Sequence, residues 1–241
     1  MCFTLSVQVE KHRLEKFMNA RFREDFSFEP FYFVSAFDFP VIPVITSGNP
    51  EFFTPMSWGL IPSWVKTPTE AKSIKEKTLN ARIESILEKP SFRYSAESNR
   101  CIVPATGFFE WQQIHGKKIP WFIGLSNNEI MHLAGIYSTW TNSETGEIID
   151  TFSIITIPAN PLLEKIHNTK KRMPAILKPN QAEKWLDKDL KTSLYPEIIK
   201  PVEQEYLKAY TVSPIVSNPK ANRNIPDVLE PYSYPEQQSL F

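Results

Sequence analysis

Short stretches in which apolar and polar residues alternate recur along the chain, and this period of two is typical of half-buried β-strands. Phe3 to Val7 is the first such stretch, and the residues from Phe31 to Ile45, broken by prolines, predict two more extended pieces. Polar turns separate many of the strands, so we expect neighbours to pair as antiparallel hairpins. The pattern is densest at residues 101–103, 107–111, 120–124, 131–140 and 152–157.

Apolar residues at helical spacing are less common and predict a few short helices. In one of them Ile83, Ile86 and Leu87 would share an apolar face, and Asn80 stands where an N-cap residue would stand. The sequence therefore predicts an α+β fold, a single domain of mainly antiparallel β-sheet, barrel-like or sandwich-like, with peripheral helices. The helical stretches are residues 9–18, 79–87, 160–167 and 179–186.

Length and composition favour one domain. The 241 residues include 7 Gly and 21 Pro, which indicates short, stiff connections rather than flexible linkers. We expect the domain to span residues 1–224. From about Ile225 onward the chain is proline-rich and acidic without Lys or Arg, which predicts a disordered acidic tail over residues 225–241.

Charge and cysteine content limit the classes of function. Lysine plus arginine equals aspartate plus glutamate, 27 each, so contact with nucleic acid would need a local basic patch. Cys2 and Cys101 show neither metal-ligand spacing nor a disulfide framework, and we expect no metal and no cofactor. We find no signal peptide and no apolar run near the ~18 residues of a membrane span, so we expect a cytoplasmic protein without membrane contact.

The first two residues offer the most distinctive chemistry. Removal of Met1 would leave Cys2 with its α-amine and its thiol on adjacent carbons. An α-amine has a reference pKa of ~8 against ~10.4 for a lysine, so more of it is neutral and nucleophilic at pH 7. The amine can attack an aldehyde, and the neighbouring thiol can then close a five-membered thiazolidine ring. The alternative is that Cys2 merely happens to follow the initiator methionine.

Aromatic and polar residues further along the chain are candidates for binding. Trp58 and Trp64 could stack on unpaired bases while Lys66 meets a phosphate, or both rings could belong to the core. Asn80 could orient an amine or a hydroxyl group rather than cap a helix. Arg82 could grip a phosphate rather than lie on the surface as an ordinary charge.

Two titratable residues are candidates for proton transfer. Glu110 lies between Phe109 and Trp111 on an apolar strand. Directed inward it would have a raised pKa and could act as a general acid, and directed outward it would be an ordinary surface carboxylate. His167 falls at a helix end, where the dipole favours the protonated ring, and a basic cluster ending in Arg172 follows it. The pair could couple proton transfer to phosphate binding or could be only a basic helix end.

Together these positions resemble the SRAP family, the SOS-response-associated peptidase-like proteins that bond covalently to abasic sites in single-stranded DNA. The matching segments occur in the order of the family, within about the first 215 residues. The combination is far more specific than any one segment. The segments are Cys2, Trp58 to Pro62, Asn80 to Arg82, Arg100 to Trp111, and His167 with Arg172 to Pro174.

The resemblance implies a role for each matching residue. Cys2 would trap the ring-opened aldehyde as a thiazolidine that shields the abasic site, by lyase-type Schiff-base chemistry. Asn80 would hold the amine or the sugar, Glu110 would donate and accept protons, and His167 would assist ring opening and reversal. The family is also filed among peptidases, because self-catalysed removal of the first methionine was suspected. The residues that would contact DNA are Arg82, Arg172, Trp64 and Lys66.

The sequence departs from the family pattern at three places. Phe3-Thr4 stands where Gly-Arg often follows the cysteine, so a phosphate contact is not assigned there. The interval between His167 and Arg172 is longer than usual, which weakens the assignment of Arg172. The segment from Val34 to Phe37 replaces an Asn-X-Ala-Pro motif and receives no assignment.

The final residues resemble the short peptide by which bacterial DNA-repair proteins dock on the β sliding clamp. A glutamine amide, Gln237, precedes two apolar anchors, Leu240 and Phe241, at the end of the predicted flexible tail. The expected partners are therefore single-stranded DNA containing abasic sites and the sliding clamp. We expect a monomer that joins the nucleoid when it binds DNA.

Two other functions stay open at this point. The protein could be a cysteine-dependent peptidase in which Cys2 is the nucleophile and His167 the base. It could also be a non-covalent reader of damaged or modified DNA, which would not need the Cys2 thiol. An adduct with DNA that depends on Cys2 distinguishes the first expectation from both of these alternatives.

Overall fold

Strands account for most of the regular structure, as the alternating pattern predicted. The structure is a computed structural model that describes residues 2–235. The strands are β1 (Thr4–Val7), β2 (Phe31–Ser35), β3 (Val41–Thr46), β4 (Asn49–Trp58), β5 (Asn80–Arg82), β6 (Arg100–Ala105), β7 (Gly107–Ile114), β8 (Lys117–Leu125), β9 (Met131–Thr141), β10 (Ile148–Pro158), β11 (Arg172–Pro174), β12 (Ile176–Leu177) and β13 (Leu207–Thr211).

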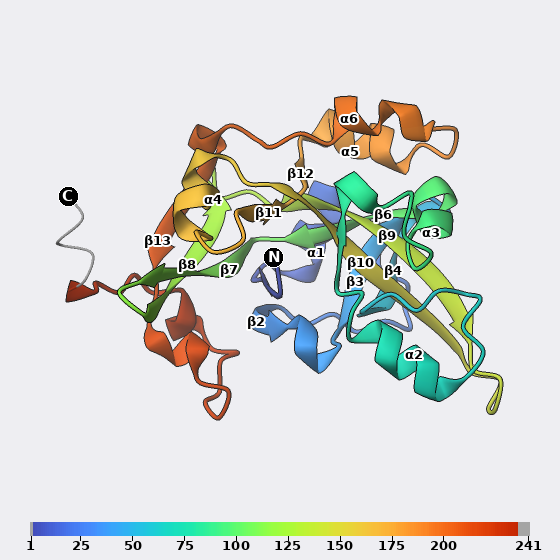
Figure 1. Ribbon diagram of the computed structural model, residues 1–241, viewed down its shortest axis with the longest axis horizontal. Coiled ribbons are helices and arrows are strands. Elements are labelled where there is room, and N and C mark those ends of the chain that lie inside the picture. Colours follow the sequence, from blue (N-terminus) through green and yellow to red (C-terminus); the bar gives the residue numbers. More distant parts are fainter. Residues whose placement is uncertain (1, 236–241) are drawn as a thin grey trace.

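Short helices lie around the sheets (Figure 1). The helices predicted at residues 9–18, 160–167 and 179–186 are confirmed as α1, α4 and α5. The α-helices are α1 (Lys11–Met18), α2 (Pro68–Lys75), α3 (Arg93–Ser98), α4 (Pro161–Ile166), α5 (Pro179–Leu186) and α6 (Tyr195–Ile198). The 3-10 turns are η1 (Ala36–Asp38), η2 (Ile83–Ser85), η3 (Thr192–Leu194), η4 (Gln204–Tyr206), η5 (Pro214–Ser217) and η6 (Pro226–Leu229).

Five strands of the larger sheet close into a barrel. β10 pairs with β4, β4 with β3, β3 with β6, and β6 with β9, which returns to β10. The β10–β4 pairing is parallel and the other four are antiparallel. Closure pairs both sides of each of these strands, so the barrel is a rigid support for the elements attached to it. One attachment is β5, which pairs in parallel with β10.

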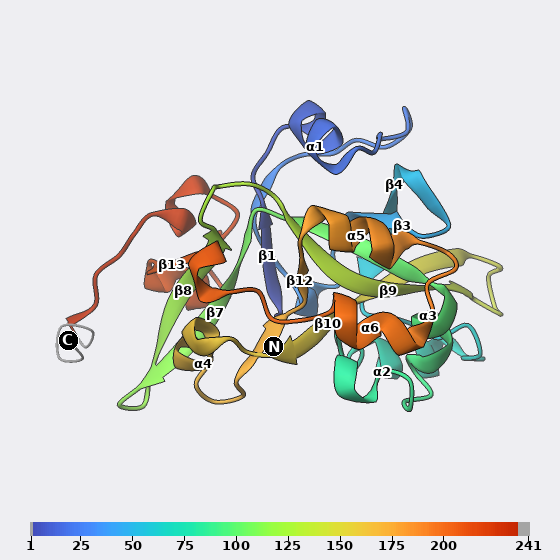
Figure 2. The same ribbon diagram turned by 90° about the horizontal axis from the view of Figure 1, so that it is seen from above.

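A second sheet has the strand order β13-β8-β7-β1-β2. β1 lies in its interior, antiparallel to both β2 and β7. Figure 2 shows β1 running through the middle of the molecule, with its beginning near β7 and β10. The prediction of an α+β domain with mainly antiparallel sheet is thus confirmed.

Apolar side chains from both sheets form the core. Trp58 is 0% exposed and stacks on Phe152 with ring centroids 5.8 Å apart, so the core alternative was correct for this tryptophan. Arg100 is also fully buried, and its guanidinium donates to the backbone carbonyls of Glu97, Trp185 and other residues at the end of α5. Within residues 2–235 no helix has the length and apolar character needed to cross a membrane.

The helix predicted at residues 79–87 is wrong. Asn80 to Arg82 form β5, and a 3-10 turn follows at Ile83–Ser85. The reason is tertiary pairing: Ile154 of β10 lies opposite Asn80, and Trp58 Nε1 donates to the Leu79 carbonyl at 2.8 Å. These contacts fix the segment as an extended strand on the barrel and override the helical spacing of its apolar residues.

The predicted disorder is also wrong for residues 225–235. Val228 in η6 is 0% exposed and packs with Phe33, Phe109, Phe122 and other residues of a small apolar cluster. The Tyr232 N–H donates to the Thr211 carbonyl at 2.8 Å, and the Tyr234 hydroxyl donates to the Val212 carbonyl at 2.7 Å. This segment covers β13 and completes the core on that side. The predicted clamp-binding residues Gln237, Leu240 and Phe241 lie outside the described residues.

Truncation of Val228 should therefore destabilise the domain. We expect Val228→Ala to lower the free energy of unfolding by about 2 kcal/mol, because two buried methyl groups leave a cavity in the cluster. Chemical denaturation followed by tryptophan fluorescence measures the effect. Val41→Ala is the matched control, since Val41 is 60% exposed and its truncation should change stability little. Equal effects of the two substitutions would contradict the packing role of residues 225–235.

Candidate active site

Strand pairing fixes the position of Cys2. Leu5 of β1 lies opposite Phe108 of β7, and the Thr4 hydroxyl donates to the Phe109 carbonyl at 3.0 Å. Because the two strands are antiparallel, the chain before Thr4 runs in the direction of Glu110, which follows Phe109 on β7. Cys2 is 0% exposed, and its thiol donates to the Thr4 carbonyl across 3.7 Å.

The side chain of Asn80 holds the backbone at Cys2. Its Nδ2 donates to the Cys2 carbonyl oxygen at 2.8 Å. Its Oδ1 is buried and accepts no hydrogen bond from any group that the structure describes. A buried amide oxygen without a donor is costly, so this atom is well suited to accept from an amine or a hydroxyl group brought to the site.

Glu110 and His167 form the second half of the site. Glu110 points inward and is 7% exposed, which decides between the two orientations that the sequence left open. Its Oε2 lies 3.5 Å from Nδ1 of His167, and the same Nδ1 lies 2.9 Å from the Arg172 carbonyl oxygen. His167 is the C-cap residue of α4, and the turn between α4 and β11 brings it to β7.

Burial shifts both of these groups toward their neutral forms. Desolvation raises the pKa of the Glu110 carboxyl above its ordinary value. Desolvation also lowers the pKa of His167 to about 4, although the hydrogen bond with the Arg172 carbonyl opposes the shift. The protonated ring expected from the helix dipole is therefore wrong for His167. α4 has only six residues, and the cost of burying the imidazolium outweighs the attraction of its dipole.

The Cys2 thiol is also held in its neutral form. Burial, reinforced by the negative charge of Glu110, raises the pKa of this thiol to about 12. At neutral pH the sulfur is therefore protonated, which makes it a weak first nucleophile. A free α-amine at this position would be the stronger candidate for the first attack.

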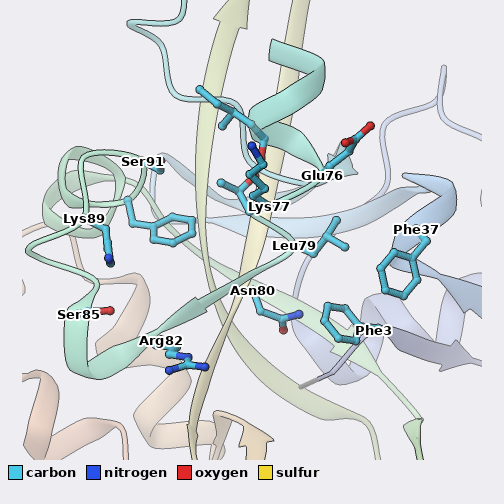
Figure 3. Close-up of a pocket in the computed structure, with 13 residues that line it drawn as sticks. Phe3, Phe37, Glu76, Lys77, Leu79, Asn80, Arg82, Ser85, Lys89 and Ser91 are labelled. Atoms are coloured by element: carbon cyan, nitrogen blue, oxygen red, sulfur yellow. The ribbon is translucent and has the colours of Figure 1, made fainter. Parts of the chain in front are cut away.

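Residues of this cluster line two hollows. The first has a volume of about 520 Å³ and is lined by Asn80 and Arg82 together with Phe3 and Phe37 (Figure 3). The second has a volume of about 410 Å³. Its lining residues are Glu110, Trp111, Gln113, Lys118, His167, Thr169, Val216, Ser217 and Arg223. Asn80 connects Cys2 to the first hollow and Glu110 connects it to the second.

Of the residues expected to contact DNA, Arg82 lines the first hollow and Trp64 lies beside it. Arg82 is exposed and lines it. Trp64 is 52% exposed, and its Nε1 donates to the Pro90 carbonyl at 3.3 Å, next to the lining residues Lys89 and Ser91. Trp64 therefore lies on the surface and not in the core. Lys66 is exposed, but it is not among the residues that line the hollow.

Arg172 does not present its guanidinium as the sequence suggested. Its two amino groups bind the two carboxylate oxygens of Glu84 at 2.8 and 2.9 Å, and one of them also donates to the Thr156 carbonyl at 2.6 Å. Its side chain is only 11% exposed. The phosphate contact expected for Arg172 is not supported, because the guanidinium is buried and already paired with a carboxylate.

Sequence reasoning missed several lining residues. Lys77 and Lys89 lie in polar stretches that look like ordinary solvated loops, and Phe37 lies in a segment without an assigned role. Lys118 and Arg223, in the second hollow, are separated by about a hundred residues. No local pattern distinguishes these residues, since only the folded chain brings them to the site. Among residues 2–235, no group of three or more His, Cys, Asp or Glu is placed to hold a metal ion.

Comparison with known sequences identifies the class of protein to which this chain belongs. The sequence profile of the family described as SOS response associated peptidase (SRAP) matches residues 1–219. The chain belongs to the SRAP family.

Similar proteins and structures cover about three quarters of the chain or more. Abasic site processing protein YoqW of Bacillus subtilis (strain 168) is 35% identical over 219 residues, which are 90% of this chain and 93% of that protein. Abasic site processing protein HMCES of Gallus gallus is 34% identical, over 73% of this chain and 56% of that protein. A crystal structure of a protein from Bacteroides thetaiotaomicron has a TM-score of 0.89 and 37% identity, and it covers 96% of this chain and 100% of that one.

The low pKa of His167 predicts sensitivity to acid. The folded state binds the proton less well than the unfolded state, so the stability contributed by the neutral ring is present above pH 6.5 and is lost as the pH falls toward about 4. We expect His167→Gln to lose less stability than the wild type over this range, as measured by urea denaturation at several pH values. Some loss should remain, since burial also lowers the pKa of His132 to about 4.

The exposed His12 provides the control for this measurement. His12→Gln should follow the wild-type profile, because this ring lies on the surface of α1. If His167→Gln and the wild type lost the same stability between about pH 6.5 and pH 4, the neutral, buried ring would be the wrong description of His167.

Proposed function

We propose that this protein processes abasic sites in single-stranded DNA by forming a covalent crosslink through Cys2 after Met1 is removed. The observation that carries the proposal is the convergence of four residues from distant segments: the Asn80 amide holds the Cys2 backbone, and the Glu110–His167 pair lies on the other side. The names of similar proteins support the same substrate, since YoqW and HMCES are both called abasic site processing proteins.

The first step is attack by the Cys2 amine on the aldehyde of the ring-opened sugar. The nitrogen bonds to the aldehyde carbon, and a proton moves from nitrogen to the former carbonyl oxygen to give a carbinolamine. The carboxyl of Glu110, which burial keeps protonated to a higher pH, gives its proton to the hydroxyl group, and this group leaves as water. A protonated Schiff base remains between Cys2 and the sugar. The unpartnered Oδ1 of Asn80 is placed to accept from the amine or from a sugar hydroxyl.

The second step closes the thiazolidine ring. The Cys2 sulfur bonds to the same carbon, and its proton passes to the Glu110 carboxylate, which restores the starting form of the acid. A thiol of high pKa can take this role, because ring closure is intramolecular and the Schiff base is a strong electrophile. The neutral imidazole of His167 would assist the opening of the sugar ring by accepting the proton of the C1 hydroxyl group and returning it to the ring oxygen, which leaves C1 as a hydroxyl group while C1 becomes the aldehyde. The product shields the abasic site from strand cleavage.

The surroundings of the cluster suit a nucleic acid strand. Arg82, Lys77 and Lys89 line the first hollow with one carboxylate, Glu76, and Lys118 and Arg223 line the second, so cationic groups lie in both hollows. A local concentration of this kind is what a chain of zero net charge needs for phosphate contact. We propose Arg82 and the exposed Trp64 as contacts for a phosphate and a base.

The geometry favours this reaction over peptide hydrolysis by a Cys–His pair. Such a peptidase needs a thiolate with an adjacent imidazole, but burial raises the pKa of the Cys2 thiol to about 12. The Nδ1 atom of His167 is in addition engaged with the Arg172 carbonyl and lies 3.5 Å from Glu110.

Crosslinking to an abasic oligonucleotide tests the proposed function. We expect wild-type protein that lacks Met1 to remain attached to the DNA on a denaturing gel, and Cys2→Ala to give no adduct. Glu110→Gln should slow adduct formation by roughly 100- to 10,000-fold, the usual contribution of a general acid. Glu144→Gln, at an exposed position in the β9–β10 turn, should react at the wild-type rate.

A form with an N-terminal extension is the second control, because it keeps the Cys2 thiol but locks the amine in a peptide bond. It should form no thiazolidine. Retention of DNA without any adduct in the wild type would favour a non-covalent reader. Turnover of peptides without an adduct would favour a peptidase.

We also propose that the last residues dock on the β sliding clamp of bacteria. The support is the sequence itself: Gln237 provides an amide, and Leu240 and Phe241 provide two apolar anchors at the chain end. Binding of the isolated peptide from residue 232 to residue 241 to purified clamp, measured by fluorescence anisotropy, tests this. A peptide with Leu240→Ala and Phe241→Ala should lose the interaction, and no binding by the unaltered peptide would end the proposal.

A further inference from the structure

Two aromatic rings form one lip of the first hollow. The ring centroids of Phe3 and Phe37 are 4.9 Å apart, and their planes are inclined by 35°. Phe37 is 62% exposed, an unusual position for a phenylalanine unless something covers it. Figure 3 shows both rings on the same side of the hollow, with the Asn80 side chain next to Phe3. The ring pair therefore lies directly beside the residues that hold Cys2.

The backbone holds this ring pair in place. The Ala36 N–H donates to the Phe3 carbonyl at 2.8 Å, and the Ser35 hydroxyl accepts from the Phe37 N–H at 3.3 Å. Phe39, the C-cap residue of the 3-10 turn η1, has a φ of 49°. The backbone of the turn is thus tied to the residue after Cys2. A surface fixed in this way loses little conformational entropy on binding.

The opposite side of the hollow has the reverse chemistry. In Figure 3 Arg82 and Lys89 lie across the hollow from the two phenylalanines, and Lys77 and the carboxylate of Glu76 line it as well. An exposed aromatic face opposite several cationic groups matches a ligand with alternating flat rings and phosphates. That description fits an unpaired strand of nucleic acid, whose bases stack on aromatic side chains while its phosphates meet lysine and arginine.

We propose that Phe37, supported by Phe3, is a stacking platform for the base next to the abasic site. The inference rests on the proposed function and adds a residue that determines which DNA is bound well. The position follows from the contacts of the two rings. Phe3 is the residue after Cys2, its ring packs on Phe37, and it lies beside Asn80, which holds the Cys2 carbonyl. When Cys2 reaches the lesion sugar, the ring pair meets the nucleotide that follows or precedes it.

The proposal is tested with abasic oligonucleotides that lack one neighbouring base. A tetrahydrofuran residue, which carries neither a base nor an aldehyde, replaces the nucleotide on the 5′ or the 3′ side of the lesion. With wild-type protein at subsaturating concentration, one of the two replacements should reduce the crosslinking rate by between about 5-fold and 150-fold, the usual effect of one base–aromatic stack. The other replacement should have a smaller effect.

Substitutions of Phe37 identify the group that senses the missing base. On the complete oligonucleotide, Phe37→Ala should reduce the crosslinking rate by a similar factor. The rate of this variant should not fall further when the neighbouring base is absent, since the two changes remove the same contact. Phe37→Trp should keep the wild-type dependence, whereas Phe37→Leu, which is apolar without an aromatic face, should behave like Phe37→Ala. The high exposure of Phe37 means that these variants should fold, and their melting temperatures check this.

A matched control comes from a second exposed ring pair. Tyr232 is 46% exposed and lies 4.8 Å from Tyr234, away from the first hollow, so Tyr232→Ala should crosslink like the wild type. If wild-type protein forms no adduct, the proposed function is wrong. If it forms the adduct and Phe37→Ala reacts equally fast, the platform is wrong while the function stands. The platform is also wrong if Phe37→Ala reduces the crosslinking rate, relative to wild type, by the same factor on the complete oligonucleotide and on the oligonucleotide that lacks the neighbouring base.

Discussion

The antiparallel pairing of β1 between β2 and β7 is the constraint on which the rest of the site depends. A chain terminus is normally the least ordered part of a protein, because few contacts restrain it. Here the strand that begins at Thr4 lies in the interior of a sheet and is bonded on both edges. The pairing of this strand restrains the two residues before it, and Asn80 of β5 adds a hydrogen bond to the Cys2 carbonyl. A reactive group at residue 2 can thus be positioned as firmly as one in the middle of a strand.

Burial at the end of this strand explains the protonation states of the site. The same exclusion of water raises the pKa of Glu110 and of the Cys2 thiol and lowers that of His167. All three groups are driven toward neutral forms, so the site contains an acid that can give up a proton and a base that can accept one. A single physical cause, desolvation, therefore sets the direction of the pKa shift of all three groups.

Local patterns in the sequence predicted the elements whose partners are near in the chain. The hairpins formed by β7 to β10 and the helices α1, α4 and α5 follow from period-two or period-3.6 spacing alone. The helix prediction at residues 79–87 was wrong because the strand there is defined by its pairing with β10, more than seventy residues away in the sequence. Disorder from residue 225 failed because one valine, Val228, and a few backbone hydrogen bonds suffice to anchor a segment of low hydrophobicity.

The catalytic candidates could be named from the sequence only because their order along the chain resembles that of a family. Their geometry could not be predicted from the sequence. The spacing of residues could not show whether the Glu110 side chain points inward or whether the Arg172 guanidinium is accessible to a ligand, since both depend on residues far away in the sequence. Arg172 is informative here: an arginine beside a candidate site suggests phosphate binding, but Glu84 has no sequence proximity that would reveal the ion pair. The sequence shows the charge of a side chain directly, but only the folded structure shows whether that charge is already paired with another residue.

Two departures from the family pattern, Phe3 and Phe37, lie in contact with each other. Taken separately, each is only the absence of an expected motif. In the folded chain the two changes are complementary, because the Ala36 N–H donates to the Phe3 carbonyl and brings the two rings together. Phe3 and Phe37 stand where the family pattern has glycine and proline, and Thr4 stands where it has arginine, so this side of the hollow carries two aromatic rings and lacks that cationic residue. Phe3 directly precedes β1 and Phe37 lies in the η1 turn, and neither is on the barrel, so these two positions can differ from the family pattern while the strands of the barrel keep their pairing.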